Sequence, residues 1–172
     1  MTNLKDHIRN IPDFPKPGII FRDITTALKK PEIFCQIIDE LYQHFKDENI
    51  DYVAAIESRG YLFGAPLAYK LNAGLVIIRK PGKLPAKVEK IEYELEYGTD
   101  SLEIHQDAIE PGKRVLIIND LLATGGTVCA ACQLIKKIGG IVIGTAFLIE
   151  LKDLKGRTHL PQSAKNITLL QY

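Results

Sequence analysis

The stretch VLIINDLLATGGT, residues 115–127, changes character twice and decides the fold of the chain. Four apolar residues run into Asn119 and Asp120, and a short link leads to two glycines flanked by threonines. The apolar run is typical of a buried strand, and the glycine-rich turn opens the next helix. Ligands of open α/β sheets bind in the crevice at the carboxyl ends of the strands. The stretch therefore predicts a strand, a binding turn and a helix in direct succession.

Further strands and helices alternate on both sides of this stretch. Short apolar runs predict strands, and runs with helical periodicity or a closing glycine pair predict helices. The strands are expected at 52–56, 75–79, 115–119, 141–150 and 167–172, and the helices at 31–48, 60–71 and 127–140. This alternation favours an α/β fold with a mostly parallel central sheet flanked by helices, in a single domain over residues 1–172.

The amino-terminal segment lacks this alternation. It carries Pro12, Pro15 and Pro17, and each proline favours an extended or turn conformation. We therefore expect an irregular arm over residues 1–30, with the first helix beginning at Pro31.

The middle of the chain contains a second exception. Residues 92–107 alternate between apolar and polar on both sides of Gly98 and Thr99, which predicts a β-hairpin. The basic run 80–90 before it has no periodicity, contains two prolines and a glycine, and is interpreted as a mobile lid rather than a nucleic-acid patch.

Composition and charge argue against several classes of protein. Hydrophobic residues make up 46% and charged residues 25%, which is typical of a globular rather than a disordered chain. A formal net charge of +1 argues against nucleic-acid binding by the protein as a whole. No apolar run reaches the roughly 18 residues of a membrane span, and the first residues lack the apolar core of a signal peptide. The three cysteines are an odd number and are not spaced as disulfide pairs, so we expect a cytoplasmic protein. We expect no nucleic-acid or membrane partner.

The turn Thr124–Thr127 has two interpretations. In the first it holds a phosphate, because helix N-terminal N–H groups attract anions, the threonines add hydroxyl donors, and Gly125 and Gly126 permit positive φ. Asp120 would then accept hydrogen bonds from sugar hydroxyls or from water around Mg²⁺. In the second it is only a strand-to-helix turn with a threonine N-cap. The patterns G-x-x-x-x-G-K-[ST] and G-x-G-x-x-G after a strand are absent, so a phosphate bound here belongs to another ligand class.

Residues 115–127 resemble the phosphoribosyl-pyrophosphate binding motif of the type I phosphoribosyltransferases. Four other blocks, in order over nearly the whole chain, resemble the branch of that family that acts on adenine. They are IPDFPKPGIIFRDIT (11–25), ESRGYLFGAPLA (57–68), RKPGKLPA with YELEYG (79–86 and 93–98) and IELKDLKGR (149–157). The resemblance implies the family's fold, with a flexible loop and hairpin over 79–104 and a small base-binding hood over 1–30.

The same resemblance implies a reaction in purine salvage. The 5-phosphoribosyl group of phosphoribosyl pyrophosphate would pass to adenine with the help of Mg²⁺, which gives AMP and pyrophosphate. A homodimer is implied as well. The Mg²⁺ would be held mainly by the substrate and water, and Asp120 would accept a hydrogen bond from that water. The peptide bond before Arg59 is expected to be cis.

Roles for individual residues are carried over by motif position. The 5-phosphate and ribose would be bound by Asn119, Asp120, Ala123, Thr124, Gly125, Gly126 and Thr127. Pyrophosphate would be bound by Ser58, Arg59, Arg79, Lys80 and Lys83, and adenine by Ile20, Phe21 and Arg22. Glu96 and Tyr97 would lie on the closing loop near the reacting base and act in catalysis with Arg59 and Lys83.

The chemistry needs residues of these types. Displacement at an anomeric carbon builds oxocarbenium character and places negative charge on the leaving group. No protein nucleophile is required, whereas cations and N–H groups in a water-excluded site stabilise the leaving pyrophosphate. Glu96 is the candidate general base, and the alternative for it is an exposed hairpin carboxylate.

Some residues depart from the family pattern or lie outside it. Asn119 stands where the family usually has the first of two acids, so one negative charge is missing. Cys129 and Cys132 form a C-x-x-C pattern, for which we favour packing of small side chains between helix and sheet over redox or zinc chemistry. His105 is expected at the surface.

Two other functions stay open from the sequence. A sister transferase acting on xanthine or hypoxanthine would share every phosphoribosyl residue. A non-catalytic sensor of phosphoribosyl pyrophosphate could lose Glu96 or the basic loop. Both features are present, which favours the enzyme.

Overall fold

The computed structural model describes residues 3–94 and 98–172 and contains two compact units, Met1–Glu40 and Leu41–Tyr172. Helix α2 (Pro31–Phe45) crosses the boundary between the units and begins at the expected proline. Within the described residues, no helix is long and apolar enough to span a lipid bilayer.

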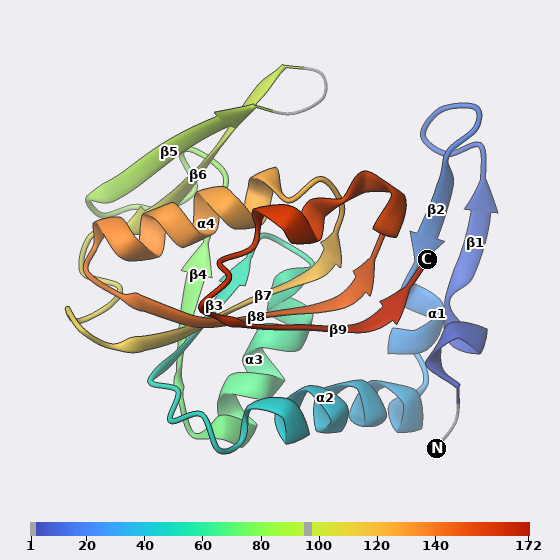
Figure 1. The fold of residues 1–172 in the computed structure, drawn as a ribbon, viewed down its shortest axis with the longest axis horizontal. Helices are drawn as coiled ribbons and strands as arrows, with labels where there is room; N and C mark the ends of the chain where they lie inside the picture. The colour runs from blue at the N-terminus through green and yellow to red at the C-terminus, as the bar shows by residue number, and fades with distance from the viewer. Residues whose placement is uncertain (1–2, 95–97) are drawn as a thin grey trace. The chain divides into compact units, whose positions relative to one another are not determined.

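The larger unit is built on a parallel sheet of five strands, in the order β4-β3-β7-β8-β9 (Figure 1). Each strand was expected from an apolar run, and neighbouring strands pair in parallel throughout. Their bounds are β3 Tyr52–Ile56, β4 Gly74–Ile78, β7 Arg114–Leu122, β8 Ile141–Glu150 and β9 Lys165–Gln171. The predicted α/β class and mostly parallel sheet are confirmed.

Two helices cover opposite faces of this sheet, α3 (Gly60–Leu71) and α4 (Gly126–Lys137) (Figure 1). The main core lies between the sheet, α4 and a hairpin, and its fully buried members include Ile117, Leu134 and Ile104. This burial positions the amino-terminal end of α4 at the carboxyl ends of the strands, where a parallel α/β sheet binds its ligands.

The hairpin consists of β5 (Val88–Glu94) and β6 (Thr99–His105), which pair antiparallel as predicted. Gly98 adopts a φ of 92°, as a glycine at a tight turn can. The predicted loop over 80–90 is shorter than expected, because β5 already begins at Val88.

Strand β7 extends further than expected. The predicted strand ends at Asn119, whereas the observed strand continues through Asp120 to Leu122. Pairing with β3 stops at Ile118, but pairing with β8 continues to Leu122 opposite Glu150. Asp120 is therefore a strand residue and not the first residue of a loop.

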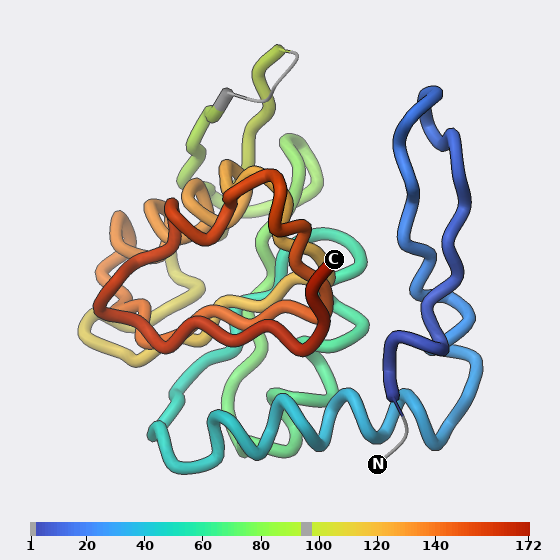
Figure 2. The backbone as a smooth tube through the Cα atoms, turned by 45° about the vertical axis from the view of Figure 1, so that its right-hand side comes forward, coloured from blue at the N-terminus to red at the C-terminus, as the bar shows by residue number. Residues whose placement is uncertain are grey.

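The carboxy-terminal part of the larger unit passes through two short helices before β9. They are η2 (Lys152–Leu154) and η3 (Gly156–His159), seen in Figure 2 as the red turns beside the start of α4. The Arg157 guanidinium binds the buried Glu150 carboxylate through both of its oxygens and also donates to the Thr168 hydroxyl. This clamp fixes η3 to the end of β8 and to the middle of β9.

The smaller unit corrects the expectation of an irregular arm. It contains η1 (Leu4–His7), a hairpin of β1 (Arg9–Pro12) with β2 (Ile20–Asp23), and α1 (Thr25–Leu28). Its prolines lie at the end of β1 and in the connection to β2, where a missing N–H costs no ladder hydrogen bond. The Thr25 N–H and the Arg9 side chain lower the pKa of Asp23 to about 2 and tie the hairpin to α1.

Candidate active site

The phosphate turn, which we define as residues Ala123–Thr127, connects β7 to α4. Gly125 is the N-cap of the helix with a φ of 91° and no side-chain cap, so the threonine N-cap of the alternative interpretation is wrong. Positive φ is confirmed for Gly125 but not for Gly126, which is the first residue of α4. The first N–H groups of a helix have no carbonyl partner inside it, so they are available to an anion at this turn.

Beside the phosphate turn lies a cavity of about 200 Å³. Its lining includes seven of the residues expected to bind phosphate, ribose or pyrophosphate: Arg59, Asn119, Asp120, Ala123, Thr124, Gly125 and Thr127. The sheet register explains why these residues lie together. Beyond Ile118 the β3 side of β7 is unpaired, and the loop after β3 occupies that side and carries Arg59.

Arg59 and Asp120 form an ion pair inside this cavity. The Arg59 Nε lies 2.9 Å from an Asp120 oxygen, with the Asp120 side chain 6% exposed and that of Arg59 41% exposed. Burial raises the pKa of Asp120, and the Arg59 charge offsets part of that rise. A buried acceptor and a half-exposed cation thus lie together at the end of β7.

Gly156, a glycine outside the predicted site, packs directly against the backbone of the phosphate turn. Gly156 is buried, and a Cβ on it would overlap the Ala123 carbonyl and lie 3.0 Å from the Gly125 nitrogen. Conversely, a Cβ on Gly125 would lie 2.7 Å from the Gly156 carbonyl oxygen. The two backbones therefore cross in direct contact. Gly156 stood in the block IELKDLKGR, but nothing local to that block indicated its contact with the turn.

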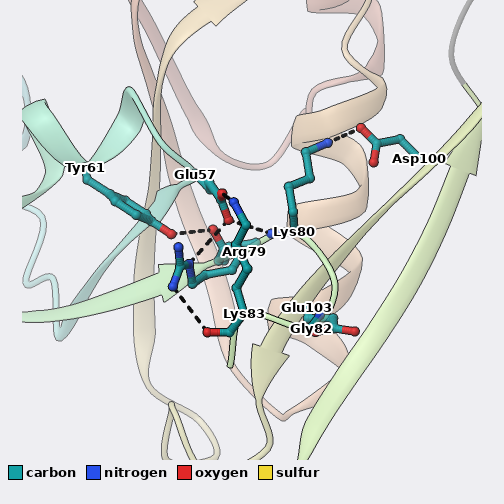
Figure 3. Close-up of polar contacts among 9 residues, drawn as sticks. Glu57, Tyr61, Arg79, Lys80, Gly82, Lys83, Asp100 and Glu103 are labelled. Atoms are coloured by element: carbon teal, nitrogen blue, oxygen red, sulfur yellow. Dashed lines mark hydrogen bonds and ion pairs between the residues drawn. The ribbon is translucent and has the colours of Figure 1, made fainter. Parts of the chain in front are cut away.

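The cation loop, which we define as residues Arg79–Lys83, surrounds a carboxylate that the sequence did not single out. Figure 3 shows Arg79 and Lys83 converging on Glu57, the first residue after β3. One Glu57 oxygen accepts the Lys80 backbone N–H at 2.7 Å and lies 3.3 Å from the Arg79 Nε, and the other binds the Lys83 ammonium. Burial alone would raise the pKa of Glu57, but the Lys83 ammonium and the Lys80 N–H outweigh it and lower that pKa.

The side chain of Lys80 points away from Glu57 toward the hairpin (Figure 3), where its ammonium binds Asp100. The Tyr93 hydroxyl lies 3.3 Å from the same carboxylate and 3.3 Å from the Thr127 hydroxyl. Asp100 raises the pKa of Lys80 against the effect of burial, so this lysine remains charged. A continuous polar chain thus joins the cation loop to the phosphate turn.

A second cavity of about 310 Å³ adjoins the other side of the turn, between the hairpin, α4 and η3. His159, for which no role was expected, lines this cavity with Tyr93 and Cys129. Cys129 is only partly buried here, whereas Cys132 is buried in the core as predicted. Burial raises the pKa of the Cys132 thiol to about 12.

The remaining predicted residues belong to the smaller unit, precede Arg59 directly, or fall outside the described part of the chain. Ile20, Phe21 and Arg22 are on β2 of the smaller unit, where the Phe21 ring meets Phe14 edge-on at 5.3 Å. Glu96 and Tyr97 fall outside residues 3–94 and 98–172. Ser58 is exposed, and the cis peptide bond lies between Glu57 and Ser58, one residue earlier than expected.

Two further expectations concern single side chains. The Asn119 side chain donates to the Leu121 carbonyl at 3.4 Å, which leaves its own carbonyl oxygen beside Gly60. His105 is partly exposed, which is consistent with a surface position, and its Nε2 accepts the Ala86 N–H at 3.4 Å.

Taken together, the site offers an anion-binding helix N-terminus, a buried carboxylate beside it and a cluster of cations that is held by Glu57. A phosphorylated sugar matches the first two features, since the turn can bind its phosphate and Asp120 its hydroxyls. A second, more highly charged group matches the cations.

Comparisons with known proteins agree with this reading. Residues 24–170 match the model of the phosphoribosyl transferase domain. An adenine phosphoribosyltransferase of a Cyanothece species is 63% identical over 159 residues, which cover 92% of this chain and 94% of that protein.

Solved structures give the same result. The crystal structure of adenine phosphoribosyltransferase from Thermoanaerobacter pseudethanolicus matches with a TM-score of 0.94 and 53% identity, over 98% of each chain. The enzyme from Saccharomyces cerevisiae, crystallised with adenine and an imino-altritol bisphosphate, matches with a TM-score of 0.91 and 41% identity, over 97% of this chain and 96% of that one. The chain belongs to the phosphoribosyltransferase family and, within it, to the adenine phosphoribosyltransferases.

Proposed function

We propose that the residues of this site divide the work of one reaction, the transfer of the 5-phosphoribosyl group from phosphoribosyl pyrophosphate to adenine. That reaction gives AMP and pyrophosphate and serves purine salvage, as in the family. The observation that carries the assignment of residues is the cavity of about 200 Å³, where the phosphate turn meets the Arg59–Asp120 pair.

The sugar is bound by the turn and by the end of β7. The N–H groups of the phosphate turn and the hydroxyls of Thr124 and Thr127 bind the 5-phosphate. Asp120 accepts hydrogen bonds from the ribose hydroxyls, and Asn119 contributes a neutral amide beside it. The desolvated Asp120 also favours positive charge near it, which suits the oxocarbenium-like sugar of the transition state.

The leaving pyrophosphate is bound by Arg59, the Ser58 backbone and the cations Arg79, Lys80 and Lys83. These groups stabilise the charge that grows on the leaving oxygen as the bond to the sugar breaks. In the described structure these cations already have carboxylate partners in Asp120, Glu57 and Asp100, and each cation is still partly exposed to a ligand.

Adenine is bound by the segment Ile20–Arg22 and loses its proton to Glu96, which lies with Tyr97 on the connection between β5 and β6. This assignment rests on motif position. We also infer that residues 1–172 act as one functional domain, with 1–30 as the base-binding segment and 79–104 as the catalytic loop and hairpin.

The residues of the cavity fit a Mg²⁺ ion that is bound mainly by substrate oxygens and water. Mg²⁺ prefers oxygen ligands and keeps several waters, and the cavity offers one buried carboxylate that Arg59 already neutralises in part. Asp120 would accept a hydrogen bond from a water of the ion. When bound, the ion supplies positive charge that neutralises the pyrophosphate.

We further infer a homodimer in the cytoplasm. Large apolar side chains that are exposed on α3 and on the edge strand β4 support the dimer, since an interface there would remove them from water; they are Leu62, Tyr69, Leu75 and Ile77. Size-exclusion chromatography with light scattering tests this, and a monomer at micromolar concentration would contradict it.

The deciding experiment is a turnover assay with phosphoribosyl pyrophosphate and Mg²⁺. Adenine, hypoxanthine, guanine and xanthine are supplied in turn, and the nucleotide product is identified by chromatography. We expect AMP from adenine and no product from the other bases. Tight binding of the substrate without turnover would contradict the proposal and indicate a sensor.

A further inference from the structure

The carboxylate of Glu57 is where the loop after β3 and the cation loop after β4 meet. Strands β3 and β4 pair in register with Ile56 opposite Ile78, so the residues that follow them, Glu57 and Arg79, lie side by side. The Glu57 N–H donates to the Ile78 carbonyl at 2.9 Å, which extends the ladder by one bond. The position of Glu57 is therefore set by the sheet and not by a flexible loop.

From this position Glu57 organises the cation loop at three points. It binds the Lys80 N–H, the Arg79 guanidinium and the Lys83 ammonium, and its own side chain is only 8% exposed. The loop is closed on itself by the Arg79 guanidinium, which donates to the Lys83 carbonyl at 3.2 Å. A single buried carboxylate thus determines where two cations lie.

The charge balance of this cluster leaves it able to bind an anion. Arg79 and Lys83 carry two positive charges against the one negative charge of Glu57. Their side chains are 30% and 47% exposed, so both cations remain open to a ligand while their positions are restrained. Restraint before binding lowers the entropic cost of gathering the cations around the ligand.

A second buried carboxylate provides a natural comparison. Glu103 on β6 is 8% exposed and also accepts an N–H of the cation loop, that of Gly82 at 3.0 Å. Its backbone pairs with that of Arg79 in a β-bridge. Within residues 3–94 and 98–172, no hydrogen bond or ion pair joins its carboxylate to the side chain of Arg79 or Lys83. Glu103 therefore anchors the loop backbone without contacting these cations.

We propose that Glu57 is a positioning residue for the pyrophosphate group, which it serves by holding Arg79 and Lys83 in place for the ligand. This inference rests on the proposed function of those two cations. Glu57 itself does not contact the ligand and has no part in binding adenine.

The test compares Glu57→Gln with the matched variant Glu103→Gln. Each amide retains an oxygen for its loop N–H, and each change removes one buried negative charge. We expect Glu57→Gln to raise the KM for phosphoribosyl pyrophosphate and the inhibition constant of pyrophosphate about tenfold, the effect of losing one charge-assisted contact. The KM for adenine should stay within about twofold, and Glu103→Gln should leave all three constants within the same range.

A double-mutant cycle with Lys83→Met shows whether Glu57 acts through the cation. In the Lys83→Met background, Glu57→Gln should cost much less than it does in the wild type. Equal shifts in Glu57→Gln and Glu103→Gln, a parallel rise in the KM for adenine, or additive effects in the cycle would overturn the proposal. Thermal unfolding of each variant identifies loss of the fold. If Glu57→Gln does not fold, Glu57→Asp, which keeps the charge but withdraws it by one methylene, takes its place in the cycle with the same outcomes.

The wild-type assay separates this inference from the function on which it depends. Failure of the wild type to form AMP would remove the proposed function. An active wild type with additive effects in the cycle would remove only the role of Glu57.

Discussion

The phosphate turn and the cation loop, which we propose bind neighbouring parts of one substrate, are built in different ways. The turn is defined by backbone geometry, with Gly125 at positive φ and in contact with the Gly156 backbone. The cation loop is defined by side-chain charge, because Glu57 binds Arg79 and Lys83. An added methyl group should therefore disrupt the turn, whereas a neutral isosteric change should disrupt the loop.

The largest effect is expected from Gly156→Ala, because its Cβ would overlap the Ala123 carbonyl. The backbone at the turn must shift, so we expect destabilisation by about 1–3 kcal/mol. Activity should fall at least about 100-fold, because a phosphate site that shifts by about an ångström loses its productive geometry. Thermal unfolding measures the loss of stability. The turnover assay measures the loss of activity, and calorimetry with AMP shows whether the phosphate site is impaired.

Gly112→Ala is the matched control. Gly112 has a φ of 83° and no atom near the position of an added Cβ. Only backbone strain of about 1 kcal/mol is expected there, with AMP affinity unchanged. Equal loss of AMP affinity in both variants would show that the contact with Ala123 does not matter.

Asp120→Asn separates charge from shape at the end of β7. Loss of the charged acceptor for the ribose hydroxyls should lower kcat/KM by about 10- to 100-fold. The melting temperature should nevertheless rise by about 2–4 °C near neutral pH, since the change removes a desolvated charge from a functional site. Steady-state kinetics and calorimetry on the same preparation test both parts, and a lower melting temperature near neutral pH would contradict the second.

The stability gain of Asp120→Asn should depend on pH. Burial raises the folded-state pKa of Asp120 above its ordinary value of 3.8, so its protonated form favours folding. That contribution is complete below the unfolded-state pKa and is lost as the pH rises through the folded-state pKa. The difference in melting temperature between variant and wild type should therefore be larger at about pH 8 than at about pH 4. A difference that is constant across this range would contradict the assignment.

Asn119→Asp restores the acid that the family usually has. It adds a negative charge to the cavity beside the phosphate turn. The Asn119 side-chain amide donates to the Leu121 carbonyl, and Asn119 lines the same cavity as Asp120 and Arg59. We expect an active variant whose Mg²⁺ titration midpoint moves by a few-fold, about 1 kcal/mol or less, while the KM for adenine is unchanged. An unchanged Mg²⁺ titration would show that this charge is dispensable.

The smallest effect is expected from Tyr93→Phe, which removes the hydroxyl between Asp100 and Thr127. Both hydrogen bonds are long, so the loss should be about 0.5–1 kcal/mol, or roughly two- to fivefold in kcat/KM. The loss should vanish in an Asp100→Asn background if the tyrosine acts through that carboxylate. A loss of about 100-fold would mean that the turn and the loop are coupled more tightly than their separate construction implies.

Much of this molecule follows from short-range sequence signals. The apolar run 115–118, the acid after it and the paired glycines predicted the strand, the turn and the helix, because hydrophobic periodicity and glycine conformation act over a few residues. For the same reason the hairpin around Gly98 and the five parallel strands were found. The short hairpin of the smaller unit was missed, because its prolines mask a pairing that depends on the partner strand.

Tertiary structure alone decided which distant residues complete the site. The register of β3 against β4 places Glu57 beside Arg79, and the pairing of β7 with β8 makes Asp120 a buried strand residue. The clamp of Arg157 on Glu150 returns Gly156 to the phosphate turn. Apart from the Arg157–Glu150 clamp, these contacts join residues more than twenty positions apart, and no local pattern encodes them, because they depend on the pairing of strands and the packing of the segments that follow.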